Sequence, residues 1–102
     1  WGRVPVDVHL VHPTLAARLD PHATVDALGR AAAVAHPKLV PMVAHGWEGD
    51  APYYVTARPE GTALASRLKR ERPLPVDEAL AIARDLAAGL AAAHAAGVRH
   101  GD

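Results

Sequence analysis

Two β-prone runs joined by a short, turn-rich segment constrain the fold of this chain more than any other feature. The first run, Leu39–Ala44, is apolar, and the second, Tyr53–Thr56, is rich in aromatic and β-branched residues. The segment between them, His45–Asp50, carries two glycines and is too short for the crossover that parallel strands require. The two runs are therefore predicted to form a hairpin, and the sheet that contains it is predicted to be antiparallel.

A third strand is predicted near the start of the chain, where aliphatic residues occupy every second position from Val4 to Leu10. One face of this strand is aliphatic, and the other face carries Asp7 and His9. The two polar side chains are therefore expected to lie together on one side of the sheet.

Helices are predicted on both sides of the hairpin. The first begins at Asp20-Pro21, an N-cap residue followed by a proline, and ends at His36-Pro37, because the residue before a proline avoids the α conformation. Ala63–Glu71 is predicted to form a short helix, and Val76–Ala96 a long one that stops at Gly97. The order strand, helix, strand, strand, short helix, long helix is typical of an α+β fold.

The composition and the spacing of the residues argue against several kinds of partner and site. The 11 Lys and Arg residues balance 11 Asp and Glu residues, and a chain without net charge is not built to coat nucleic acid. No apolar run reaches the ~20 residues that a membrane helix needs. The chain has no cysteine, which removes disulfides and fits a reducing, cytoplasmic location. Its histidines show no ligand spacing, so no metal site is predicted.

Six segments resemble, in order, those of protein kinase domains, closest in style to the bacterial Ser/Thr kinases. Val6–Pro13 is similar to the strand usually written V-A-V-K-V-L-H-P, and His36–Val40 resembles H-P-N-I-V, which follows the regulatory helix of the family. Pro52–Thr56 is similar to the strand that enters the hinge between the lobes. Glu60–Leu64 matches E-G-x-x-L, and Pro73–Val98 resembles the long first helix of the large lobe. His100–Asp102 falls where the family has H-R-D.

The resemblance implies a fragment of the protein kinase-like fold with three parts. Residues 1–56 correspond to part of the small lobe, with its third strand, regulatory helix, and fourth and fifth strands. Residues 57–61 correspond to the hinge, and residues 62–102 to the start of the large lobe as far as the catalytic loop. On this expectation the phosphate-binding glycine loop precedes residue 1, and the metal-binding Asn and the D-F-G segment follow residue 102.

The resemblance also implies a nucleotide site. It places Thr56 at the gatekeeper position, places Ala57, Arg58 and Pro59 in the hinge, and brings in ATP and Mg²⁺ as the ligands that the family uses. Asp102 falls at the position of the catalytic base that accepts the proton of the substrate hydroxyl.

The sequence departs from the family pattern at the positions that handle phosphate. His9 stands where the family has the lysine that holds two phosphates, and Asp7 stands where the family has a small alanine. The glutamate partner of that lysine is replaced by Ala27, and the arginine of the catalytic loop is replaced by Gly101. A carboxylate beside the phosphates would repel them, and a neutral imidazole cannot replace a fixed ammonium group.

These departures favour a pseudokinase that acts in signalling by regulated protein binding, with weak or absent binding of ATP and Mg²⁺. Its expected location is the cytoplasm, or the cytoplasmic part of a membrane-anchored protein. The alternative is an active phosphotransferase with Asp102 as the base, either a Ser/Thr protein kinase or an enzyme of the aminoglycoside and choline type, whose catalytic loop is also spelled H-G-D.

Two further hypotheses follow from the same residues. In the first, the chain is a fragment without an independent role, and exposed apolar surface on its long helix makes it prone to self-association. Alternatively, a register shifted by two residues would leave Asp7 and His9 on a solvent-facing strand with no functional meaning.

Overall fold

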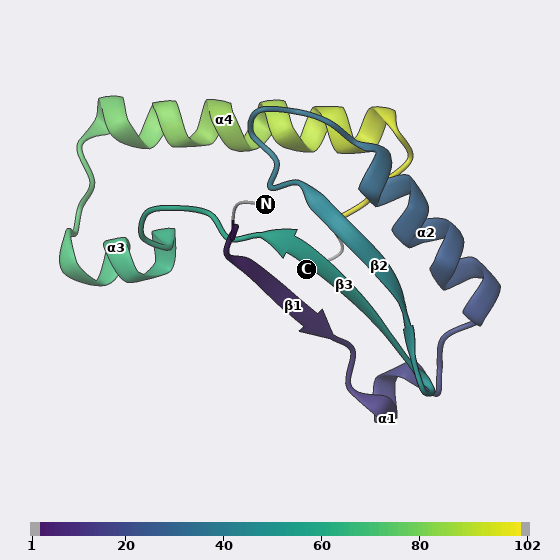
Figure 1. Ribbon diagram of the computed structural model, residues 1–102. Coiled ribbons are helices and arrows are strands. Elements are labelled where there is room, and N and C mark those ends of the chain that lie inside the picture. Colours follow the sequence, from purple (N-terminus) through teal and green to yellow (C-terminus); the bar gives the residue numbers. More distant parts are fainter. Residues whose placement is uncertain (1–2, 101–102) are drawn as a thin grey trace.

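A three-stranded antiparallel sheet organises the chain, whose computed structural model describes residues 3–100. The strands are β1 (Val6–Leu10), β2 (Met42–Glu48) and β3 (Ala51–Ala57), and they lie in the order β1-β3-β2 (Figure 1). Both neighbours of β3 run antiparallel to it. The prediction of an α+β fold with an antiparallel sheet is therefore confirmed.

The hairpin is present, but its boundaries differ from those predicted. β2 begins at Met42 instead of Leu39, because the backbone N–H of Leu39 donates to the carbonyl of His36 in a turn and Pro41 has no N–H to offer a ladder. The strand then continues through Glu48, which pairs with Ala51. The turn is thereby reduced to Gly49-Asp50, where the positive φ of 62° at Gly49 suits a residue without a Cβ.

The helices are α1 (Pro13–Ala16), α2 (Pro21–Ala33), α3 (Leu64–Arg70) and α4 (Val76–Ala95). Helix α1 is a single turn that the sequence patterns did not predict. At its start the ring Nδ1 of His12 accepts a hydrogen bond from the backbone N–H of Thr14, at 3.2 Å.

The C-terminal ends of α2 and α4 differ in how closely they follow the prediction. The prediction that α2 continues to His36 is wrong, because Val34 already has an extended backbone and its side chain lines a cavity beside the sheet. The stop of α4 at Gly97 is confirmed, since Gly97 has a φ of 77° and its N–H donates to the carbonyl of His94. The N–H of Val98 donates to the carbonyl of Ala93, which completes a Schellman motif.

Little of the chain is shielded from solvent. The radius of gyration is 15.9 Å, against the ~13 Å of a compact domain of this length. The buried apolar side chains among residues 3–100 are small, namely Ala16, Ala51 and Pro52. The covered stripe of α4 runs through Ile82, Gly89 and Ala93, whereas Leu80 and Leu86 are exposed by half or more. The exposure of apolar surface on the long helix, expected from the sequence, is thus present.

An ion-pair cluster joins α3 to α4. The guanidinium of Arg67 contacts Glu71 one turn later, at 2.8 Å, and also contacts Glu78 in the first turn of α4. These hydrogen bonds hold the pKa of Glu78 below its usual value and raise the pKa of Arg67. The ion pair between Arg67 and Glu78 connects the two helices through exposed side chains, so its contribution to stability is sensitive to salt.

We expect the contribution of Glu78 to stability to disappear in acid. Because the pKa of Glu78 is lower in the folded state than in the unfolded state, its stabilising effect is present above the unfolded value and is lost as the pH falls through the folded value. Urea unfolding of the natural chain at full length should therefore show Glu78→Gln less stable than wild type at neutral pH and equal to it in strong acid. Glu48→Gln, at an exposed position of β2, is the control and should show no such convergence.

The loop after α2 approaches α4 closely at Gly89. A Cβ atom at Gly89 would meet the carbonyl oxygen of Lys38 and the Cδ2 atom of Leu39, each at 3.2 Å. The same loop is tethered to α4 by an ion pair of 3.4 Å between Lys38 Nζ and Asp85. The Lys38 backbone is itself held by a hydrogen bond of 3.0 Å from its N–H to the Nδ1 of His36, so the carbonyl has little freedom to move aside.

A matched pair of glycine substitutions tests this close approach. Gly29→Ala in α2, where a Cβ meets nothing within 4 Å, should stabilise the protein by ~0.5–1 kcal/mol through helix propensity. Gly89→Ala should forfeit that gain and destabilise by ~1 kcal/mol, because the added methyl group crowds the Lys38 backbone. The measurement is the denaturation midpoint of each variant of the natural chain, and equal stabilisation by both changes would contradict the described packing.

Candidate functional site

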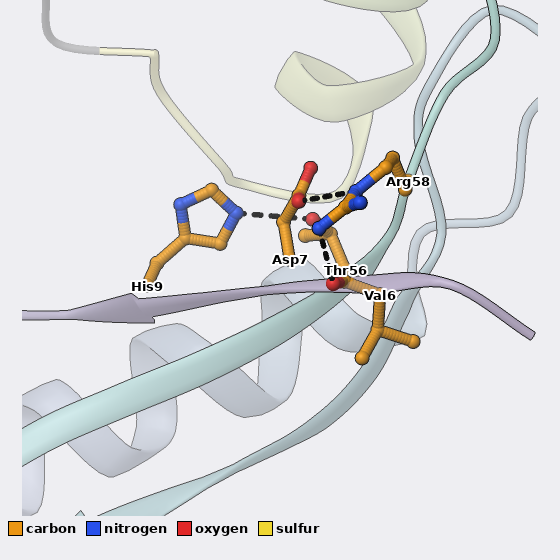
Figure 2. Close-up of polar contacts among 5 residues, drawn as sticks. All are labelled: Val6, Asp7, His9, Thr56 and Arg58. Carbon is orange, nitrogen blue, oxygen red and sulfur yellow. Dashed lines mark hydrogen bonds and ion pairs between the residues drawn. The ribbon is translucent and has the colours of Figure 1, made fainter.

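Polar side chains of β1 and β3 gather on one face of the sheet. Asp7 lies directly opposite Thr56, and His9 lies directly opposite Tyr54, in the β1–β3 register. Since successive residues of a strand point to opposite faces, these side chains share a face. Figure 2 shows Asp7 and His9 on the same side of β1, with the side chain of Val6 on the other side. The predicted placement of Asp7 and His9 on a common face is present, and both side chains are half-buried.

His9 is engaged by two residues of β3. Its Nε2 atom lies 3.0 Å from the hydroxyl oxygen of Thr56, a hydrogen bond that is drawn in Figure 2. Its ring also stacks on the ring of Tyr54, with a centroid distance of 4.5 Å and an angle of 11° between the planes. The imidazole is therefore held against the sheet by packing on one side and by a hydroxyl group at its edge.

Asp7 is paired with Arg58. The Nε atom of Arg58 donates to the Asp7 carboxylate at 2.9 Å, and its Nη2 atom donates to the backbone carbonyl of Val6 at 3.3 Å (Figure 2). The two charged side chains keep 39% and 59% of their surface exposed, so the attraction is screened by water and salt. The pair ties the residue after β3 to the beginning of β1.

The backbone of the expected hinge segment is also occupied. The N–H of Ala57 donates to the carbonyl of Pro41, and the N–H of Arg58 donates to the carbonyl of Pro5, both at 3.1 Å. Pro59 has no N–H and lines a shallow depression with Ala57 and Pro41. The segment is thus held to the strands on either side of β3.

An apolar cavity of about 220 Å³ lies beside Thr56. It opens between α2, the Met42 and Thr56 positions of the sheet, and the C-terminal half of α4. Its lining is mainly aliphatic, with contributions from Ala31, Val34, Leu39, Leu90 and Val98. His100, the first residue of the expected catalytic loop, also lines this cavity.

The other residues predicted to differ from or match the kinase pattern do not join the polar cluster of β1 and β3 or lie outside the described residues. Ala27 is exposed on α2, and so is its neighbour Asp26, so neither side chain joins the polar cluster of β1 and β3. Asp102 and Gly101 lie outside the described residues. Within residues 3–100 no group of three His, Cys, Asp or Glu side chains could hold a metal ion. In the same part of the chain, no helix is long and apolar enough to cross a membrane.

Two contributions to the site were not predicted from the sequence. The sequence predicts Tyr54 only as part of a β-prone run, and the resemblance places Arg58 only in the hinge. Their contacts with His9 and Asp7 depend on β1 pairing with β3 instead of β2. Once that neighbour and the facing pair Val6 and Ala57 are known, counting along the two antiparallel strands pairs His9 with Tyr54.

Comparison with known proteins matches the chain to serine/threonine-protein kinases of two bacteria. The chain is 60% identical to the serine/threonine-protein kinase PkaB of Streptomyces coelicolor over 42 residues, which are 41% of this chain and 10% of that protein. It is 41% identical to the serine/threonine-protein kinase PknD of Mycobacterium tuberculosis over 78 residues, which are 76% of this chain and 11% of that protein. No protein-family model matches the sequence.

The chain therefore carries a kinase-like stretch of the bacterial Ser/Thr type, and its sheet and helices agree with the small lobe of such a domain. It spans about a tenth of the length of the curated relatives that it matches.

A double-mutant cycle should measure the coupling between His9 and Thr56. Thr56→Val keeps the shape of the side chain but removes the hydroxyl partner of His9, and we expect a loss of ~1 kcal/mol in unfolding free energy. In a His9→Ala background the same change should cost clearly less, because the hydrogen bond is already absent. Equal costs in both backgrounds, measured by urea unfolding of the natural chain, would show that the contact contributes nothing.

Proposed function

We propose that this chain is part of a pseudokinase, a kinase-like domain that acts by binding other proteins and transfers phosphate weakly or not at all. The observation that carries the proposal is the engagement of His9, which stands at the family's lysine position and is hydrogen-bonded to Thr56 and stacked on Tyr54. A residue held in this way offers no mobile cation to a phosphate group.

The charge of the site supports the same conclusion. Phosphoryl transfer depends on cations that neutralise the phosphates and position them. The carboxylate of Asp7 is negative, and Arg58, the one cation in contact with it among residues 3–100, is drawn toward Asp7 and the Val6 carbonyl. These residues therefore do not fit a nucleoside triphosphate with Mg²⁺, although ATP and Mg²⁺ are the ligands expected of kinase relatives.

The exposed apolar surface of β1 and α4 is of a kind that further polypeptide covers, either the rest of the kinase-like domain or a binding partner. Large aliphatic side chains of β1 and α4 keep a third or more of their surface open to solvent, namely Val6, Val8, Leu10, Leu80, Leu86 and Leu90. Surface of this kind on a soluble protein is commonly covered by another polypeptide. We further propose that the domain works in the cytoplasm, where bacterial kinases meet their protein partners.

The alternative proposal is an active Ser/Thr kinase in which Asp102 is the catalytic base. It draws support from the printed names of the relatives, both of which are serine/threonine-protein kinases. Those relatives also favour a protein kinase over an aminoglycoside or choline phosphotransferase. The two proposals differ in whether nucleotide binds.

Thermal unfolding of the natural chain at full length, with and without millimolar Mg·ATP, distinguishes them. A ligand at 100 times its dissociation constant stabilises by ~2.7 kcal/mol, which gives a clear shift in midpoint. We expect no shift for wild type and a shift for the Asp7→Ala/His9→Lys double variant, which removes the repelling carboxylate and supplies an ammonium group. His22→Lys, an exposed change on α2, is the control and should show no shift.

The opposite result is equally clear. A shift in wild type that disappears on chelating the metal, together with phosphotransfer that is lost in Asp102→Asn, would overturn the pseudokinase proposal and establish the active kinase.

A further inference from the structure

Two His-Pro turns flank α2 along the chain. His12-Pro13 begins α1, which precedes α2, and His36-Pro37 lies in the loop that leads from α2 to β2 (Figure 1). In each turn the Nδ1 atom of the histidine accepts a hydrogen bond from the backbone N–H two residues further on. The donors are Thr14, at 3.2 Å, and Lys38, at 3.0 Å.

Both hydrogen bonds require an uncharged imidazole ring. A backbone N–H can only donate, so the Nδ1 atom must offer its lone pair, whereas a protonated imidazole is a donor at both nitrogens. His9 differs, because the Thr56 hydroxyl that its Nε2 atom contacts can either donate or accept. Uptake of a proton therefore preserves the contact of His9 but removes the bonds of His12 and His36.

The turn at His36 positions Lys38 against α4. Its hydrogen bond holds the Lys38 backbone, whose carbonyl oxygen would lie 3.2 Å from a Cβ atom at Gly89, and the Lys38 ammonium group pairs with Asp85 at 3.4 Å. The turn at His12 orders the first residues of α1, which packs against β3, while α2 itself packs against β2. Both connections of α2 to the rest of the chain therefore contain a hydrogen bond that a proton removes.

We propose that the two His-Pro turns make the position of α2 sensitive to pH. When both imidazole rings take up a proton, the backbone N–H groups of Thr14 and Lys38 lose their acceptors, and the connections of α2 loosen from β3 and from α4. A histidine side chain ordinarily takes up its proton at about pH 6.5, so the change falls between about pH 5 and about pH 8. The proposal is independent of whether the domain transfers phosphate.

Neither ring forms an ion pair with a carboxylate within residues 3–100. The charged and titratable groups on the neighbouring elements are, near His36, Arg30 of α2, Lys38 of the loop, Asp85 of α4, and Arg99 and His100 after α4, and, near His12, Arg18 and Asp20 before α2 and Asp50 in the β2–β3 turn. Asp85 already binds Lys38. The hydrogen bond from a backbone N–H is the polar contact that the structure gives to the side chains of His12 and His36.

Asparagine replaces the acceptor without replacing the titration, because its Oδ1 atom also accepts from the backbone N–H two residues further on. We expect the urea midpoint of the natural chain at full length to fall between about pH 7.5 and about pH 5.5, with a decrease on the order of tenfold in the folding equilibrium constant. The His12→Asn/His36→Asn double variant should match wild type at the higher pH and lose this decrease. The control is His22→Asn/His45→Asn, at two exposed histidines without a side-chain hydrogen bond within residues 3–100, which should titrate as wild type does.

Hydrogen exchange of the same full-length chain gives a local readout. After correction for the intrinsic pH dependence of amide exchange, protection at Thr14, in α2 and at Lys38 should decrease in wild type over this pH range. It should stay constant in the double asparagine variant. Helix α3 is the internal control, because the side chain that pairs it with α4, Glu78, has a lowered pKa and remains ionised under these conditions.

Three results would overturn the proposal. One is a double asparagine variant whose midpoint falls with pH as that of wild type does. A second is a loss of the pH dependence in the control at His22 and His45. The third is protection at Thr14 and Lys38 that does not change with pH in wild type. Single His12→Asn and His36→Asn variants, each expected to remove about half of the decrease in the logarithm of the folding constant, decide the question where the double variant fails to fold.

Discussion

The central strand β3 is the element on which the rest of the structure depends. It forms hydrogen bonds with β1 on one side and β2 on the other, and its residues provide partners for both edges. The last residue of β3, Ala57, and the residue after it, Arg58, donate their backbone N–H groups to the carbonyls of Pro41 and Pro5, respectively. A shift of one residue in the β1–β3 register would turn Asp7 and His9 to the opposite face and dissolve their contacts with β3.

The polar cluster of β1 and β3 is therefore a consequence of register. Thr56 and Tyr54 lie two residues apart on β3 and so share the face toward which His9 points. Arg58 continues the same alternation beyond the end of the strand and reaches Asp7. A hydrogen bond, a ring stack and an ion pair thus engage the side chains that the family resemblance assigns to a nucleotide site, and the proposed loss of phosphotransfer rests on these contacts.

The buried apolar core within residues 3–100 is small. Alanine is the main apolar residue of the helices, and alanine removes little area from water when it is covered. The larger aliphatic side chains of β1 and α4 face solvent instead, and the charged Arg67, Glu71 and Glu78 hold α3 to α4 across an open connection. Within residues 3–100, backbone ladders join the three strands, and exposed ion pairs connect α3 to α4.

The sequence by itself determined the local elements. The hairpin followed from the short distance between two β-prone runs, the start of α2 from Asp20-Pro21, and the stop of α4 from Gly97, because each depends on a few adjacent residues. The family resemblance also came from order and spacing along the chain. Tertiary structure decided the end of α2 at Ala33, the later start of β2 at Met42 and the choice of β3 as the neighbour of β1. It alone brought Tyr54 to His9 and Arg58 to Asp7, because contacts between residues some fifty positions apart depend on strand order and register, which local propensity does not encode.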